Sequence, residues 1–122
     1  MALMAFAVPI LPGKTEQWRR FVGDLNGPRR GEYEESRRRL GIRERTFLQS
    51  SPQGDVVIVT LEGDDPAGSL RRFAATNDPF TRWFAQQVHE IHGIELAQIV
   101  LMPPPELAVD SEPGAAQLKR AA

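Results

Sequence analysis

The chain contains no cysteine, which removes several kinds of chemistry at once. Without thiols there is no disulfide, no thiolate nucleophile and no cysteine-ligated zinc, and nothing requires an oxidising compartment. Net charge is also nearly absent, at -1, because 15 Lys and Arg face 16 Asp and Glu. Such a balance gives no general attraction to phosphate backbones or anionic lipids, so we expect neither a nucleic-acid partner nor a membrane partner.

The chain also lacks a long hydrophobic run at its start. The segment MALMAFAVPI has no basic residues and reaches Pro9 within ten residues. This pattern is neither that of a signal peptide nor that of a membrane span, and it favours a cytoplasmic location. The 122 residues are 41% hydrophobic and 25% charged, which is typical of one globular domain.

What the sequence does contain is a clear β-hairpin signal over residues 42–63, IRERTFLQSSPQGDVVIVTLEG. Two strand-like runs flank the turn sequence SPQG. Pro52 fixes φ at the second turn position, and Gly54 can take the positive φ that closes a turn with a bulge. A register that opposes residues 50 and 55 is the simplest one for this turn.

Helical periodicity occurs on both sides of the hairpin. Before it, one helix follows Thr15, the expected N-cap, and a second begins near Gly31 and ends at Gly41. After it, Asp-Pro pairs at 65–66 and 78–79 each predict an N-cap followed by proline at the first helical position, and Gly93 ends the last helix. The residues expected to face inward are Trp18, Phe21, Val22, Leu25, Tyr33, Leu40, Leu70, Phe73, Ala74, Phe80, Trp83, Phe84, Gln87, Val88 and Ile91.

The second helix carries a run of three arginines at residues 37–39. We interpret this run as a solvated face, because consecutive helical residues point about 100° apart and cannot converge on one anion. The i, i+4 spacing predicts ion pairs between Glu34 and Arg38 and between Glu35 and Arg39.

Two further apolar runs predict strands at the ends of the domain. Residues 3–10 are expected to be buried on both sides, with Pro9 at the end of the strand, and residues 94–102 are expected to form a fourth strand. Three prolines then start a segment without periodicity. We therefore divide the chain into a domain at 1–102 and a flexible Pro-led tail at 103–122.

This order of elements predicts an α+β fold of the ferredoxin-like type, β-α-β-β-α-β, with one antiparallel sheet and helices on one face. The other face would expose more apolar surface than a monomer usually tolerates. Two copies that pack these faces together would bury it, so we expect a homodimer that encloses a barrel between its subunits.

Three segments of the chain, LNGPRRGEYEESRRRLGI, GIRERTFLQSSPQGDVVIVTLEG and DPFTRWFAQQVHEIHGIEL, resemble an uncharacterised bacterial family of the dimeric α+β barrel superfamily. With the first strand they span about residues 3–102. Members of this superfamily include cofactor-free monooxygenases, small isomerases and lyases, and haem-binding or haem-degrading proteins. The resemblance implies the fold and the homodimer, and it assigns no role to any residue.

The hairpin supplies the first candidate ligand site. In the predicted register Arg43 faces Glu62, Arg45 faces Thr60 and Phe47 faces Ile58, all on one side of the sheet. If that side lines the barrel, Arg43, Arg45 and Glu62 form a polar pocket suited to an acidic or enolisable aromatic ligand. The alternative is an ordinary cross-strand salt bridge near a sheet edge.

The helices supply further candidates. His89 and His92 lie three residues apart, a spacing that could ligate a metal or haem iron, although His92 also suits the negative end of the helix dipole and either could be a surface residue. Trp83 could line a ligand cavity or belong to the core. Tyr33, the only tyrosine, could reach a ligand at the barrel mouth.

No motif names a reaction, so the sequence leaves enzymatic activity open and predicts no cofactor. The favoured hypothesis is a protein that binds or transforms a small aromatic or acidic molecule in a cavity between sheet and helices. The alternative is a non-enzymatic dimerisation or interaction module whose barrel is filled by side chains.

Overall fold

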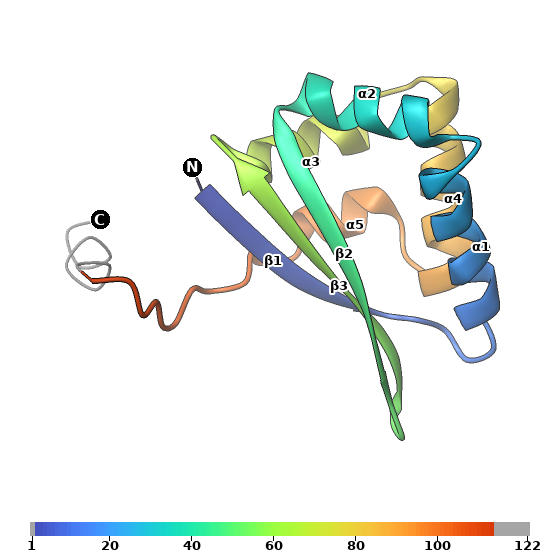
Figure 1. Ribbon diagram of the computed structural model, residues 1–122, viewed down its shortest axis with the longest axis horizontal. Helices are drawn as coiled ribbons and strands as arrows, with labels where there is room; N and C mark the ends of the chain where they lie inside the picture. The colour runs from blue at the N-terminus through green and yellow to red at the C-terminus, as the bar shows by residue number, and fades with distance from the viewer. Residues whose placement is uncertain (1, 114–122) are drawn as a thin grey trace.

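Residues 2–113, the part of the chain that the computed structural model describes, contain three antiparallel strands and five helices (Figure 1). The elements in order are β1 (Ala2–Pro9), α1 (Thr15–Asn26), α2 (Arg30–Leu40), β2 (Ile42–Ser51), β3 (Gly54–Gly63), α3 (Pro66–Ala75), α4 (Pro79–His92) and α5 (Leu96–Leu101). The fold is therefore of the mixed α+β class, as the sequence predicts.

The sheet has the order β1-β3-β2, with the hairpin strand β3 in the centre. The predicted register is confirmed, because Ser50 pairs with Asp55, and Arg43, Arg45 and Phe47 pair with Glu62, Thr60 and Ile58. Gly54 takes the expected positive φ, at 126°. Alternation along the strands therefore groups the hairpin side chains into the two sets that the sequence predicts, one on each face of the sheet.

The expected fourth strand at residues 94–102 is wrong. The chain forms helix α5 there, and within residues 2–113 the sheet has three strands, so the complete ferredoxin-like order is not present. The Gln98 side chain accepts a hydrogen bond from the backbone N–H of Glu95 at 2.6 Å, which supports the first helical turn. Leu96 and Ile99, three residues apart, then both reach the core, which a strand would not allow.

The expectation that the first strand is buried on both sides is also wrong. Its inward residues Phe6 and Val8 are half-buried and buried, whereas Leu3 on the opposite side is 66% exposed. The helices lie on one side of the sheet only, which leaves the other side of β1 uncovered (Figure 1). Pro9 ends the strand, as predicted.

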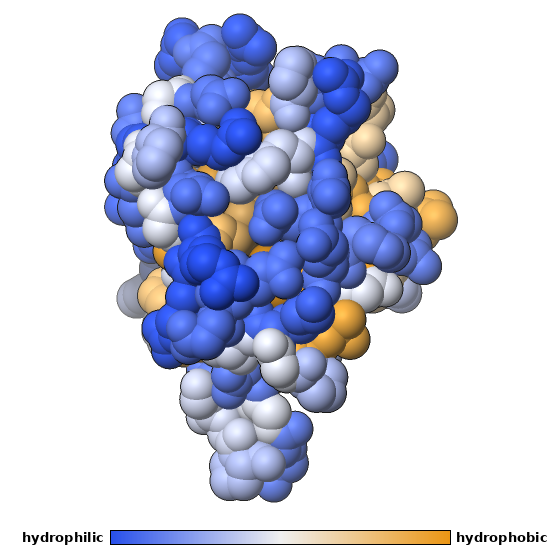
Figure 2. All heavy atoms as spheres, turned by 90° about the vertical axis from the view of Figure 1, so that its right-hand side faces the viewer, coloured by the Kyte–Doolittle hydropathy of each residue, from blue (hydrophilic) through white to orange (hydrophobic). Residues whose placement is uncertain are grey.

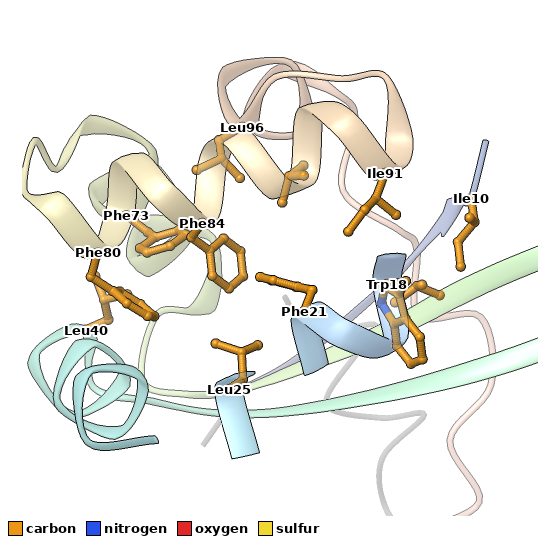
Figure 3. Close-up of a cluster of buried hydrophobic side chains, with 12 residues drawn as sticks. Ile10, Trp18, Phe21, Leu25, Leu40, Phe73, Phe80, Phe84, Ile91 and Leu96 are labelled. Carbon is orange, nitrogen blue, oxygen red and sulfur yellow. The ribbon is translucent and has the colours of Figure 1, made fainter. Parts of the chain in front are cut away.

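The core lies between the helices and the covered face of the sheet (Figure 3). Phe84 is at its centre, with its ring centroid 5.0 Å from that of Phe21 and 5.1 Å from that of Phe73, both in edge-to-face contact. The predicted helical stripes therefore do meet in one cluster. Its members are Ile10, Trp18, Phe21, Leu25, Leu40, Val57, Phe73, Phe80, Phe84, Val88, Ile91 and Leu96.

Most helix ends follow their sequence signals. Asp65 and Asp78 accept hydrogen bonds from the N–H groups of Gly68 and Thr81, at 3.1 and 2.7 Å. Gly41 and Gly93 end their helices in the left-handed region, as predicted.

Thr15 is not the N-cap of α1, because it is already the first helical residue and Lys14 precedes it as the cap. The Thr15 hydroxyl instead donates to Asp55 Oδ2 at 2.6 Å. This bond ties the start of α1 to the start of β3, so the side chain connects two elements rather than capping one.

The charged helix α2 follows its prediction in part. Arg39 pairs with Glu35 at 3.0 Å, as expected, and Arg38 also contacts Glu35. The predicted pair of Glu34 with Arg38 is wrong, since Glu34 pairs with Arg30 at 2.6 Å. The solvated-face interpretation holds for the second and third arginines of the run and fails for the first, Arg37, which is buried.

No helix within residues 2–113 is long and apolar enough to cross a membrane. Residues 103–113 form neither helix nor strand, and the remainder of the predicted tail lies outside the described residues.

Candidate functional site

A cavity of about 280 Å³ lies between the covered face of the sheet and the helices. Most of its wall is apolar, and a few polar side chains reach it from α1, α2, β2 and α4. Figure 2 shows the side of the molecule that faces right in Figure 1, where mostly hydrophilic side chains surround smaller hydrophobic areas. The apolar lining includes Phe6, Val8, Trp18, Phe21, Val22, Leu25, Leu40, Val57, Val59, Phe73, Phe84, Val88 and Leu96.

Two local patterns bring polar groups to one wall of this cavity. On α2, Tyr33, Arg37 and Leu40 lie at i, i+4 and i+7 and so share the inward face. On β2, alternation points Glu44 and Thr46 to the covered face of the sheet. The single residue between these elements, Gly41, has a φ of 67° that reverses the chain and sets α2 against β2.

Arg37 and Glu44 form a nearly buried ion pair at this wall. Arg37 Nε lies 2.7 Å from Glu44 Oε1, and each side chain is only 10% exposed. Arg37 Nη1 also donates to Ser36 Oγ at 2.9 Å, and Glu44 Oε2 accepts from the Thr46 hydroxyl at 3.1 Å. The pair is therefore held from both sides, as a buried charge pair requires.

Aromatic rings surround the Arg37 guanidinium. Its central carbon lies 4.5 Å from the ring centroid of Phe73, 4.8 Å from that of Tyr33 and 4.9 Å from that of Phe84. Cation–π attraction over three rings offsets part of the cost of removing the cation from water. The same rings fix the guanidinium at the boundary between the core and the cavity.

Tyr33 completes the polar cluster. Burial, together with the negative charge and hydrogen bonding of Glu44, raises the pKa of its phenol to about 12 against the opposing effect of the Arg37 cation. The phenol is therefore uncharged at neutral pH and can act as a hydrogen-bond donor.

A separate polar group reaches the cavity from the C-terminal end of α4. His92 lines the cavity, and its Nδ1 lies 2.8 Å from the backbone oxygen of Pro9. Burial lowers the pKa of the imidazole, and the Pro9 carbonyl opposes that effect only in part. The lowered pKa favours the uncharged imidazole at pH 7, and the half-buried side chain lines the cavity from its position at the helix end.

Of the six residues that the sequence singles out for ligand binding, only Tyr33 lines this cavity. Arg43, Arg45 and Glu62 lie together as predicted, but on the face of the sheet that the helices leave uncovered. Arg45 Nη2 is 3.1 Å from Glu62 Oε1, which is the cross-strand salt bridge of the alternative interpretation. A ligand role for these three residues stays a prediction, and it would concern the uncovered face.

Trp83 and His89 also lie outside the cavity lining. Trp83 packs against Phe21 and Phe80, and the guanidinium carbon of Arg29 lies 4.2 Å from its ring centroid. His89 is 58% exposed, and its Nδ1 lies 2.8 Å from Glu95 Oε1. Within residues 2–113, no three His, Asp or Glu side chains group together as a metal site would need.

Arg37 and Glu44 line the cavity without having been candidates from the sequence, and His92 was a candidate only as a metal or haem ligand or a surface residue. The helical spacing of Arg37 from Tyr33 and Leu40 was a signal for burial, and the alternation of Glu44 with Ile42 and Leu48 was another. For His92 the sequence offered no comparable signal, because its environment depends on where the end of β1 meets α4.

Comparison with protein-family models, curated proteins and solved structures finds no match to this chain. The site is therefore interpreted from its geometry alone.

Proposed function

We propose that the chain binds a small molecule with an apolar body and an acidic or carbonyl group in the cavity between the sheet and the helices. The observation that carries this proposal is the Arg37–Glu44–Tyr33 cluster on the wall of an otherwise apolar cavity. Ligand sites in proteins characteristically combine an apolar wall with a few fixed polar groups.

The size and charge of the cavity narrow the class of ligand. Its volume of about 280 Å³ is nearly twice the roughly 150 Å³ that holds one benzene ring. Among the described residues, its charged lining groups are two cations, Arg30 and Arg37, and one anion, Glu44. Arg30 and Arg37 are each paired with one carboxylate, Glu34 and Glu44. A guanidinium carries five N–H donors, so those left over, together with a neutral phenol donor, suit a carboxylate or a carbonyl oxygen on a body larger than one ring.

The test compares binding of 2-naphthoic acid and of uncharged 2-methylnaphthalene by calorimetry. We expect wild type to prefer the acid. The double variant Arg37→Met with Glu44→Leu should fold, because apolar replacement of a buried pair is often neutral or stabilising, and should lose this preference. Replacing the exposed pair on the same helix, Arg39→Met with Glu35→Leu, is the matched control and should leave the preference intact. Failure of wild type to bind the acid would contradict the proposal.

A second proposal, of a homodimer, concerns the uncovered face of the sheet. Leu3 and Phe47 are 66% and 52% exposed there, and Ile58 and Val56 share the same face. Two copies packing these faces together would remove the apolar surface from water. Such a pairing is what the resemblance to the dimeric α+β barrel superfamily implies, and it is compatible with a ligand on the opposite face of each sheet.

A dimerisation module without a ligand is the alternative function, and the same exposed face favours it. The two proposals separate experimentally, because the double variant at Arg37 and Glu44 changes the covered face and leaves the uncovered face unaltered.

A further inference from the structure

The hydrogen bond of His92 determines the state of its imidazole. A backbone carbonyl oxygen can only accept, so Nδ1, 2.8 Å from the oxygen of Pro9, carries the hydrogen in this contact. In the neutral ring the remaining nitrogen, Nε2, is then an acceptor. Among residues 2–113, Nε2 has no protein partner. His92 therefore brings an unused acceptor to the cavity lining.

His92 and the Arg37 cluster lie at different levels of the sheet. Glu44 shares its row with Leu61, whereas the Pro9 carbonyl that holds His92 follows Val8, which shares its row with Val57. Leu61 and Val57 are four positions apart along β3, which corresponds to about 13 Å. The cavity is continuous between these rows, because Val57, Val59 and Leu61 all line it.

We infer that His92 is a second ligand anchor, whose Nε2 accepts a hydrogen bond from a hydroxyl group at the end of the ligand remote from Arg37. This inference rests on the proposed function and specifies its ligand class as an elongated, mostly apolar acid or carbonyl compound with a terminal hydroxyl. The row spacing of about 13 Å along β3 favours a ligand whose two polar groups stand at opposite ends of an extended body, such as a naphthalene ring system.

The test measures dissociation constants of 2-naphthoic acid and 6-hydroxy-2-naphthoic acid for the full chain. A net hydrogen bond corresponds to about a two- to tenfold gain in affinity, so wild type should bind the hydroxy acid more tightly by that factor. His92→Leu, which has no acceptor, should bind both acids equally. His92→Gln should recover part of the preference, since an amide can donate to Pro9 and offer its oxygen to the ligand.

His89→Leu is the matched control, because His89 lies one turn away on α4 and outside the cavity lining. It should retain the wild-type preference for the hydroxy acid. If His92→Leu does not fold, His92→Phe removes the same acceptor and fills more of the space.

The outcomes distinguish failure of the His92 anchor from failure of the proposed ligand binding in the cavity. Equal affinity of wild type for both acids, or a preference that survives in His92→Leu, would overturn the role of His92 while leaving the Arg37 anchor in place. If wild type binds neither acid, the proposed function fails and the second anchor fails with it.

Discussion

At the scale of single residues, the position of Arg37 on α2 determines the environment of its side chain. The three consecutive arginines of α2 are chemically alike, yet two are exposed and one is buried among aromatic rings with Glu44. A buried ion pair contributes little net stability compared with an apolar pair of the same shape, but breaking it leaves an uncompensated charge. Removing one partner should therefore destabilise the fold much more than replacing both partners with apolar residues.

Glu44→Ala should therefore lower the free energy of unfolding by roughly 3 to 5 kcal/mol, because Arg37 would remain buried without its carboxylate partner. Urea denaturation measures the change. Arg37→Met with Glu44→Leu should unfold close to wild type. A small effect of Glu44→Ala would mean that water reaches Arg37 and that the pair is not buried in solution.

His92 gives a prediction for pH. Its pKa is lowered in the folded protein from the ordinary value of 6.5, so below that pH the unfolded chain takes up a proton that the folded chain does not. This group therefore makes stability fall as the pH drops from 7 towards the folded pKa. His92→Gln should show a shallower loss of stability than wild type between pH 7 and 5. Parallel pH profiles would place the imidazole in water.

At the scale of elements, local sequence signals predicted the hairpin and most helix ends. They failed where one segment was compatible with both a helix and a strand. The turn sequence around Gly54 admits few conformations, so the hairpin and its register could be predicted. Residues 94–102 are apolar apart from Glu95 and Gln98, and the Gln98 side chain supports the first turn of the helix by accepting a hydrogen bond from the Glu95 N–H. The burial of Arg37 likewise depends on how α2 packs on β2, which is a tertiary contact.

The contribution of the α4 N-cap, Asp78, to stability can be measured separately. Asp78 accepts from the Thr81 N–H at 2.7 Å, and this bond lowers the pKa of the carboxyl. Asp78→Ala should cost about 1 kcal/mol of unfolding free energy at neutral pH. The adjacent Asn77→Ala removes only an exposed contact to Arg82 and should cost less than about 0.5 kcal/mol. Equal losses would show that the cap does not stabilise α4.

At the scale of the whole molecule, the helices divide the sheet into a covered face with a cavity and an uncovered face with exposed apolar residues. The sequence predicted both faces by alternation along the hairpin. It could not predict which face encloses the cavity, because that depends on the side from which the helices pack. In the structure, the candidate hairpin residues Arg43, Arg45 and Glu62 consequently lie on the face opposite the cavity.

The proposed homodimer is tested at this scale by sedimentation equilibrium. Wild type should show twice the 13.6 kDa of one chain at micromolar concentration, with an interface of roughly 1,200 to 2,000 Å². Phe47→Glu should yield monomers, because it places a charge among the exposed apolar residues of the uncovered face. Leu101→Glu changes an apolar residue on α5 that is even more exposed, at 82%, and should leave the dimer intact. A monomeric wild type would contradict the proposal.

The central claim, a ligand in the cavity on the covered face, is tested most directly by intermolecular nuclear Overhauser effects between 2-naphthoic acid and the methyl groups of β3. Alternation provides the control within one strand, because Val57 and Val59 line the cavity while Val56 and Ile58 face the other way. We predict contacts from the naphthalene protons to Val57, Val59 and the Tyr33 ring. Contacts confined to Val56, Ile58 and Phe47 would contradict the account, because they would place the ligand on the uncovered face.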